Sequence, residues 1–372
     1  MTTATEATGA PRTRRHSVTH RLRVAAVDRL TDDAVAVTFA VPAELAADYD
    51  FAAGQHVNVA LPGGDGVRRS YSICSPAGFG VLRIAVKRIP GGAFSSHALE
   101  TLAAGDEIDV MTPAGRFTPS FRPEQARHYA LVAAGSGITP VLSIVATALA
   151  TEPRSRVTLL YGNRTSSSVM FLDELADLKD LYPGRLQLVH VLSREPGSTE
   201  LLSGRLDGDR LGRVLDTLLP PDTVDDWYLC GPYDLVTTAR AVLAARGVGR
   251  AHVHAELYHV GDPPPALRSE MDTAVRSAAV TCAVTASLDG RRTEVTVDDP
   301  DETVLEAVLR VRNDAPFACK GGVCGTCRAK VLGGAVTMER RYALEDDEIE
   351  AGYVLTCQSH PTTPTLEVDY DA

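Results

Sequence analysis

Long apolar runs are missing from this chain of 372 residues, because none approaches the roughly 20 apolar residues that cross a bilayer. Residues 1–17 also lack the apolar segment of a secretory signal and are rich in Thr, Ala and Arg. We interpret them as a disordered tail. The sequence thus favours a soluble protein in the cytoplasm.

An excess of positive charge is missing as well. The net charge is −11, so the phosphates of a nucleic acid would be repelled. Residues 276–372 hold 17 acidic and 10 basic residues, so most of the negative excess lies there. It fits either an ordinary acidic surface or a face that steers toward a basic redox partner.

A ligand set for oxygen activation is also absent. The ten histidines are scattered, and the sequence shows neither a two-His-one-carboxylate set nor an H-x-x-E-H motif. If the protein serves an oxygenase, the sequence predicts that the oxygenase is a separate polypeptide.

What the sequence does contain is a cysteine loop, Cys319-Lys320-Gly321-Gly322-Val323-Cys324-Gly325-Thr326-Cys327, followed by Cys357. The spacing C-x4-C-x2-C with a fourth, later cysteine is the ligand pattern of a plant-type [2Fe–2S] cluster, in which thiolates hold two irons. Glycines let such a loop wrap tightly and turn its N–H groups toward sulfur. The predicted metal ligands are Cys319, Cys324, Cys327 and Cys357.

Two other uses of these cysteines fit less well. A zinc site usually shows two short C-x2-C pairs, whereas this loop has an x4 gap with two consecutive glycines. A disulfide framework is disfavoured because the cysteine count, seven, is odd and no secretory signal is apparent.

The hydrophobic pattern predicts three domains and a linker. Residues 18–122 contain six short strand-like runs divided by turn residues, which favours an antiparallel β-barrel. Little of this segment is expected to be helical. The predicted strands are Arg21–Val27, Ala34–Val41, His56–Leu61, Arg69–Cys74, Val81–Ile89 and Glu107–Met111.

Residues 123–260 alternate buried strands with helix-period segments, which is typical of a doubly wound parallel α/β sheet. Residues 261–275 include three consecutive prolines and are predicted to be an extended linker. Residues 276–372 follow a mixed α+β pattern around the cysteine loop, with a helix expected over Thr303–Arg312 and a strand over Val354–Cys357.

Gly135-Ser136-Gly137-Ile138-Thr139-Pro140 follows an apolar strand and opens a helix. Glycine lets the backbone approach a pyrophosphate, and a helix N-terminus offers N–H groups and a positive dipole. By itself, however, a G-x-G turn is equally often a plain strand–helix turn.

Three further motifs accompany it in order: Arg69-Ser70-Tyr71-Ser72, Gly91-Gly92-Ala93-Phe94-Ser95 and Cys230-Gly231-Pro232. Together they resemble the ferredoxin–NADP reductase superfamily, in which an FAD-binding barrel precedes a pyridine-nucleotide domain. Residues 280–370 resemble plant-type ferredoxins with a β-grasp fold.

The resemblance implies a set of FAD contacts. Arg69 is expected to hold the pyrophosphate, Tyr71 to stack on the isoalloxazine, and Ser72 to hydrogen-bond near N5, the atom that accepts hydride. Without that context, Tyr71 fits equally well as a half-buried strand aromatic. The other implied FAD contacts are Ser70 and the backbones of Gly92, Phe94 and Ser95.

Nucleotide contacts follow in the same way. Cys230 is expected to lie against the nicotinamide of the coenzyme. The other residues expected to bind the coenzyme are Gly135, Gly137, Thr139, Pro140, Gly231 and Pro232. Alone, a cysteine that closes an apolar strand is more often a small buried hydrophobe. Glu256 is similar to a glutamate near the flavin in this superfamily and is a proton-relay candidate, or otherwise an ordinary strand-edge glutamate.

The choice between NADPH and NADH is predicted from the residues at the end of the expected strand, which ends at Ser193. In plant-type reductases a Ser-Arg pair here binds the 2′-phosphate of NADP, and Ser193-Arg194 matches it. Arg164 is placed to assist. NADPH is therefore the expected donor, with NADH as the alternative.

The domain order matches an electron path, because a flavin accepts a pair of electrons from a nicotinamide and releases them singly to a cluster. The loop, Tyr342–Glu345 and Gly352–Gln358 are most similar to the reductases of phenylacetyl-CoA epoxidases, whose oxygenase component is di-iron. Reductases of 3-ketosteroid 9α-hydroxylases come next. A flavohaem-like reductase and a cluster-based redox sensor remain alternatives.

Overall fold

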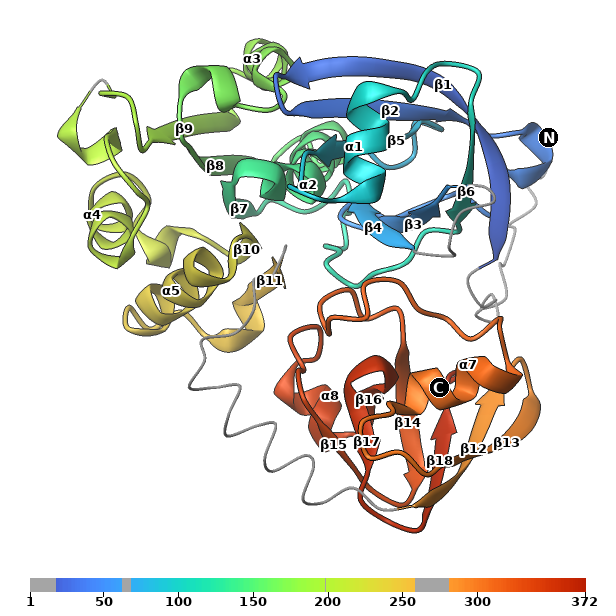
Figure 1. Cartoon of the computed structure of the whole chain (residues 1–372). Coiled ribbons are helices and arrows are strands. Elements are labelled where there is room, and N and C mark those ends of the chain that lie inside the picture. Colours follow the sequence, from blue (N-terminus) through green and yellow to red (C-terminus); the bar gives the residue numbers. More distant parts are fainter. Residues whose placement is uncertain (1–17, 62–67, 198, 258–280) are drawn as a thin grey trace, which may run out of the picture.

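The computed structural model describes residues 18–61, 68–197, 199–257 and 281–372. The predicted tail, residues 1–17, and the predicted linker, residues 261–275, lie outside the described residues. Three folded units follow one another along the chain (Figure 1).

The first unit is a six-stranded antiparallel sheet in the order β4-β3-β6-β1-β2-β5. An additional bridge between Ile73 and Ile84 links the end of β4 to β5, so the two edges of the sheet meet and the barrel closes. The predicted barrel and its six strands are confirmed. They are β1 (Thr19–Thr31), β2 (Ala34–Ala40), β3 (His56–Ala60), β4 (Arg69–Ser72), β5 (Leu82–Lys87) and β6 (Glu107–Met111).

One helix in this unit was not predicted. Helix α1 (Ala93–Glu100) follows β5 and inserts Phe94, Ala98 and Leu99 into the barrel core. The spacing of these three residues is helical, but eight residues after two glycines give a weak periodic signal. The helix matters because Gly92, Phe94 and Ser95, the predicted phosphate contacts, lie at its start.

The second unit is a parallel five-stranded sheet in the order β11-β10-β7-β8-β9. Chain order reverses beside β7, which is the kind of switch point where open α/β sheets bind ligands. The predicted α/β domain is confirmed. Its elements are β7 (His128–Ala134), α2 (Ile138–Thr151), β8 (Arg156–Asn163), α3 (Leu172–Leu181), β9 (Leu186–Leu192), α4 (Gly208–Leu218), β10 (Asp226–Gly231), α5 (Tyr233–Ala244) and β11 (Val253–Leu257).

The third unit is a mixed sheet in the order β13-β12-β18-β14-β16, packed against helix α7 (Val304–Val311). Helix α7 begins with a capping box between Thr303 and Glu306, close to the predicted start. The remaining elements are β12 (Cys282–Leu288), β13 (Arg291–Val297), β14 (Arg328–Gly333), β15 (Val336–Met338), α8 (Asp346–Glu350), β16 (Tyr353–Leu355), β17 (Ser359–Pro361) and β18 (Thr365–Asp369).

The predicted strand over Val354–Cys357 was too long. Strand β16 ends at Leu355, and Cys357 lies in a single 3-10 turn, Thr356–Gln358. The turn is held by hydrogen bonds from the Thr356 amide and hydroxyl to the carbonyl of Cys327, at 3.2 and 2.9 Å. It therefore brings the fourth cysteine to the cysteine loop.

Contacts between units involve charged side chains at the rim of the third unit. Glu345 accepts hydrogen bonds from Arg240 at 2.7 Å and Arg250 at 2.9 Å, and Asp346 lies 2.5 Å from Arg250. Glu348 pairs with Arg116 of the first unit. Part of the acidic excess of residues 276–372 is therefore neutralised by arginines of the same chain.

Candidate functional site

Strand β4 presents the Arg-Ser-Tyr-Ser motif at the edge of the barrel that faces the other two units. The ring of Tyr71 is partly buried and packs against Phe94, with ring centroids 5.3 Å apart. Arg69 is exposed, and its guanidinium donates to the carbonyl of Arg68 at 2.9 Å. An aromatic face beside an exposed guanidinium suits a flavin ring and its pyrophosphate.

The first turn of α1 lies beside this strand. The Gly92 amide donates to the carbonyl of Ile89 at 2.9 Å, and the Ser95 hydroxyl donates to the carbonyl of Gly92 at 3.1 Å. The amides of Phe94 and Ser95 belong to the first turn, where a helix supplies no acceptor for them. Of the three predicted backbone contacts, these two amides are the better placed for a phosphate.

Gly137 of the G-x-G turn has no room for a side chain. A Cβ at this position would lie 2.2 Å from the carbonyl oxygen of Cys230. The turn itself is a 3-10 segment, Gly135–Gly137, that leads into α2, and Thr139 Oγ1 donates to the carbonyl of Ser136 at 3.0 Å. The predicted strand–turn–helix is confirmed, and the glycine is required by the close approach of β10.

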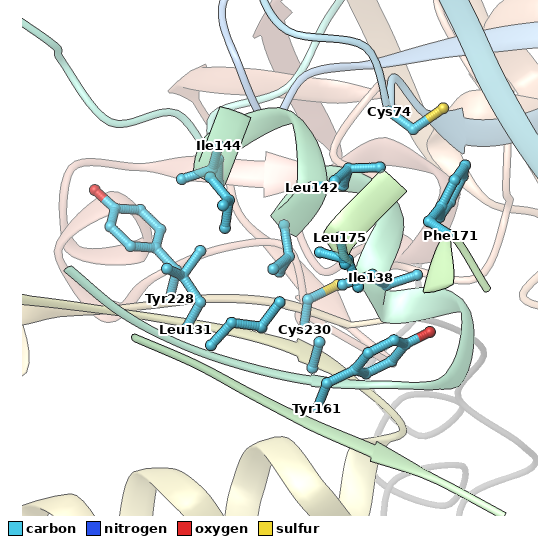
Figure 2. Close-up of a cluster of buried hydrophobic side chains, with 14 of the residues drawn as sticks. Cys74, Leu131, Ile138, Leu142, Ile144, Tyr161, Phe171, Leu175, Tyr228 and Cys230 are labelled. Carbon is cyan, nitrogen blue, oxygen red and sulfur yellow. The ribbon is translucent and has the colours of Figure 1, made fainter. Parts of the chain in front are cut away.

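Cys230, at the end of β10, is fully buried. Figure 2 shows it among Leu131, Ile138 and Tyr161, members of one hydrophobic cluster beneath α2. Burial raises the pKa of its thiol well above 9, and the charge of Glu256 adds to the effect, so the group is a neutral thiol at pH 7. Its predicted contact with a nicotinamide stays a prediction.

Glu256 lies beside Cys230, because β10 and β11 pair in register at these residues. Its Oε2 accepts a hydrogen bond from the Ser72 hydroxyl at 3.1 Å. Burial raises the pKa of Glu256 to about 7, although the Ser72 hydrogen bond acts in the opposite direction. The fold thus joins three predicted residues from two domains.

The residues predicted to select the coenzyme meet at the carboxyl ends of β8 and β9. The Arg194 amide donates to the carbonyl of Arg164 at 2.8 Å, and the Ser193 amide donates to the carbonyl of Asn163 at 2.9 Å. The side chains of Arg164, Ser193 and Arg194 are exposed. Two cationic side chains therefore project from adjacent chain segments at this edge of the sheet.

The four cysteines of the predicted cluster site come together as two pairs. The thiols of Cys319 and Cys324 lie close enough to shift each other's pKa, as do those of Cys327 and Cys357. Within the described residues, no group of three or more Cys, His, Asp or Glu side chains surrounds a position for a single metal ion. Two pairs of thiols fit a two-iron cluster, in which each iron takes two protein sulfurs.

Backbone amides stabilise negative charge on these sulfurs. The Gly321 amide lies 3.4 Å from Cys319 Sγ, and hydrogen bonding, first from Cys324 and then from backbone amides, lowers the Cys319 pKa. Gly322, at φ +76°, contributes its amide to Cys357. The loop supplies the donors that cluster sulfurs need.

Several residues that join the domains carry no sequence signal. Asn58 of β3 donates to Thr326 in the cysteine loop at 3.2 Å, and the Arg68 guanidinium lies 4.5 Å from the centroid of the Phe317 ring. A cavity of about 970 Å³ opens where the three domains meet, and its lining includes Glu256 and Cys324. These contacts depend on the placement of whole domains.

Comparisons with known proteins agree with this organisation. Family models match residues 21–118 as an oxidoreductase FAD-binding domain, 131–241 as an oxidoreductase NAD-binding domain and 286–362 as a 2Fe-2S iron-sulfur cluster binding domain. The chain is 45% identical to one of the subunits of the 1,2-phenylacetyl-CoA epoxidase of Escherichia coli (strain K12), covering 95% of this chain and 98% of the relative. The chain belongs to the reductase components of multicomponent oxygenases.

Other relatives also match this reductase over nearly its whole length. It is 34% identical to the ferredoxin reductase component of 3-ketosteroid-9-alpha-monooxygenase from Rhodococcus rhodochrous, over 94% of this chain and 96% of that one. The solved structure of phthalate dioxygenase reductase shares the fold, with a TM-score of 0.58, 24% identity and coverage of 94% and 98%. The predicted FAD, NAD and [2Fe–2S] domains are confirmed.

The reductase has no helix, among the residues that the structure describes, that is long and apolar enough to span a bilayer.

Gly137→Ala is expected to destabilise the reductase by roughly 1–3 kcal/mol, because a methyl group must displace the β10 backbone. It should also weaken NAD(P)H binding at the turn. Urea unfolding and coenzyme titration measure the two effects. Gly184→Ala, where an added Cβ meets nothing within 4 Å, is the control. Equal stability of both variants would contradict the packing argument.

Proposed function

We propose that this reductase passes electrons from NADPH through FAD and a [2Fe–2S] cluster to the oxygenase of a phenylacetyl-CoA epoxidase, in the cytoplasm. The observation that carries the electron path is the contact between β3 of the FAD domain and the cysteine loop, through Asn58 and Thr326. The choice of oxygenase rests on the 45% identity to a component of the epoxidase, against 34% for the ketosteroid enzyme.

The residues of the site fit the separate steps of such an electron path. A bound FAD supplies the conversion from a hydride donor to a one-electron acceptor. Tyr71 and Phe94 offer an aromatic surface for the ring, and Arg69 a cation for the pyrophosphate. Ser72 Oγ and Glu256 Oε2 form a hydrogen-bonded pair that can hold or take a proton.

The 3-ketosteroid system is the second candidate acceptor. Turnover with purified oxygenase components of each type separates the two. A cluster-based sensor is the alternative of another class. An enzyme should reduce ferricyanide or cytochrome c with NADPH at many turnovers per second, whereas a sensor has no need to turn over.

Cys327→Ser is the main test of the modular path. The variant should still show flavin reduction by NADPH, but it should lose the cluster absorbance and transfer to the oxygenase, because one iron loses a thiolate. Stopped-flow absorbance separates these steps. Cys282→Ser, a buried cysteine of β12 outside the loop, is the control and should retain the cluster. Loss of flavin reduction in folded, flavin-loaded Cys327→Ser would contradict the path.

The coenzyme assignment rests on charge at the ends of β8 and β9. Arg164 and Arg194 are exposed there, while the neighbouring Glu195 carboxylate accepts hydrogen bonds from the Ser166 amide at 3.0 Å and the Ser166 hydroxyl at 3.3 Å. The Glu195 carboxylate is thus hydrogen-bonded to Ser166, and the guanidinium groups of Arg164 and Arg194 remain exposed. A 2′-phosphate is what two planar cations recognise well.

Arg194→Ala should raise the KM for NADPH by about ten- to a hundredfold, the worth of one hydrogen bond to a charged group, and leave the KM for NADH nearly unchanged. Steady-state kinetics with both coenzymes measure this. Arg156→Ala, an exposed arginine at the opposite end of β8, is the matched control. An unchanged NADPH KM in Arg194→Ala would refute the assignment.

Glu256 is proposed as the proton acceptor of the flavin site. Because its pKa lies at about 7, the carboxylate is a minor form at pH 6 and the major form at pH 8. A base acts in its ionised form. Proton removal through Ser72 Oγ should therefore become faster as pH rises through 7.

In wild type, the rate of cluster reduction after NADPH mixing should rise by about tenfold from pH 6 to pH 8, as the ionised fraction of a base of pKa near 7 does. Glu256→Gln should be slower and nearly independent of pH. Rapid-mixing absorbance at several pH values tests this, with the exposed Glu44→Gln as control. The same slope in Glu256→Gln as in wild type would assign the proton to another group.

A further inference from the structure

Asn58 connects the flavin strand to the cysteine loop by a short chain of hydrogen bonds. The Ser70 hydroxyl donates to Asn58 Oδ1 at 2.6 Å, and Asn58 Nδ2 donates to Thr326 Oγ1 at 3.2 Å. Thr326 Oγ1 in turn lies 3.2 Å from Cys324 Sγ. The chain therefore runs from the residue before Tyr71 to a cluster ligand.

Burial makes this contact different from the exposed ion pairs between the NAD domain and the third unit. Asn58 is 1% exposed, and it pairs with Ser70 in the register of β3 and β4. The ion pairs of Arg240 and Arg250 with Glu345 involve side chains that are 40–62% exposed. The side-chain oxygen and nitrogen of the buried Asn58 are both hydrogen-bonded, so this contact has a defined geometry, whereas exposed ion pairs are screened by salt.

The direction of each hydrogen bond follows from the sulfur. When Cys324 is a thiolate ligand it can only accept, so the Thr326 hydroxyl donates to it. The hydroxyl oxygen then accepts from Asn58 Nδ2, and Asn58 Oδ1 accepts from Ser70. All donors in the chain point toward the sulfur, and each bond polarises the next.

We propose that Asn58 is a positioning residue, which fixes the cysteine loop against the FAD domain and strengthens the hydrogen bond from Thr326 to the Cys324 sulfur. This inference rests on the proposed function, because it assigns a residue to the step between the flavin and the cluster. It predicts two separable consequences, one for the rate of that step and one for the electronic properties of the cluster.

Asn58→Ala should slow cluster reduction by about five- to tenfold, the worth of one hydrogen bond, while flavin reduction by NADPH stays within about twofold of wild type. The cluster should also have a lower midpoint potential and altered EPR g-values, because negative charge on its sulfur is less stabilised. Amide hydrogen exchange around Thr326 should become faster. All measurements use the flavin- and cluster-loaded protein.

Variants of Thr326 provide a second test, in case Asn58→Ala fails to fold. Thr326→Val removes the hydroxyl and should reproduce the slower rate and the lower potential, while Thr326→Ser keeps the hydroxyl and should restore both. The double variant Asn58→Ala/Thr326→Val should be no slower than Thr326→Val alone. Asn313→Ala, an exposed asparagine of the same domain as the loop, is the control.

An unchanged rate and EPR spectrum in Asn58→Ala would overturn the proposal, as would fully additive effects in the double variant. Failure of the proposed function gives a different result, since wild type itself would then not reduce its cluster with NADPH.

Discussion

Strand β4 of the FAD domain is linked to both other domains, directly through Ser72 and by way of Asn58 through Ser70, and its two-residue period is what allows both links. Ser70 and Ser72 lie on the same face of the strand. Ser72 donates to Glu256 of the NAD domain, while Ser70 donates to Asn58, which reaches the cysteine loop. Tyr71, between them, turns to the opposite face and packs on Phe94. A one-residue slip of β4 would exchange these faces and break both contacts.

Features that depend on local sequence could be predicted. Barrel strands and the parallel sheet follow from hydrophobic period, and the G-x-G turn follows from the strand and helix on either side of it. The cysteine spacing predicted the two-iron site because ligand chemistry restricts both residue type and separation. In these cases the prediction rests on a pattern within one continuous stretch of the chain, the longest being Cys319 to Cys357.

Features that depend on tertiary contacts were missed or misplaced. Helix α1 is stabilised by the burial of Phe94, Ala98 and Leu99 in the barrel core, whereas its own eight residues give only a weak helical signal. Cys357 leaves the predicted strand because Thr356 bonds to the Cys327 carbonyl, 29 residues away. Asn58 reads as an ordinary polar residue in a strand, since its partner Thr326 lies 268 residues further along the chain. Even Gly137, whose motif was recognised, owes its identity to a backbone carbonyl on β10.

The acidic surface near the cluster has a different meaning once its partners are known. Glu345, Asp346 and Glu348 lie at the start of α8 and pair with arginines of both other domains. The pairs of Glu345 and Asp346 are exposed, and exposed ion pairs contribute little free energy and weaken with salt, so these pairs contribute more to the orientation of the ferredoxin domain than to its stability. The distance between the flavin strand and the cysteine loop is set instead by a buried amide. The orientation of the ferredoxin domain and its distance from the flavin strand are thus controlled by different interactions. A basic surface of an acceptor would compete with the arginines for Glu345 and Asp346, and it would leave the buried Asn58 contact intact.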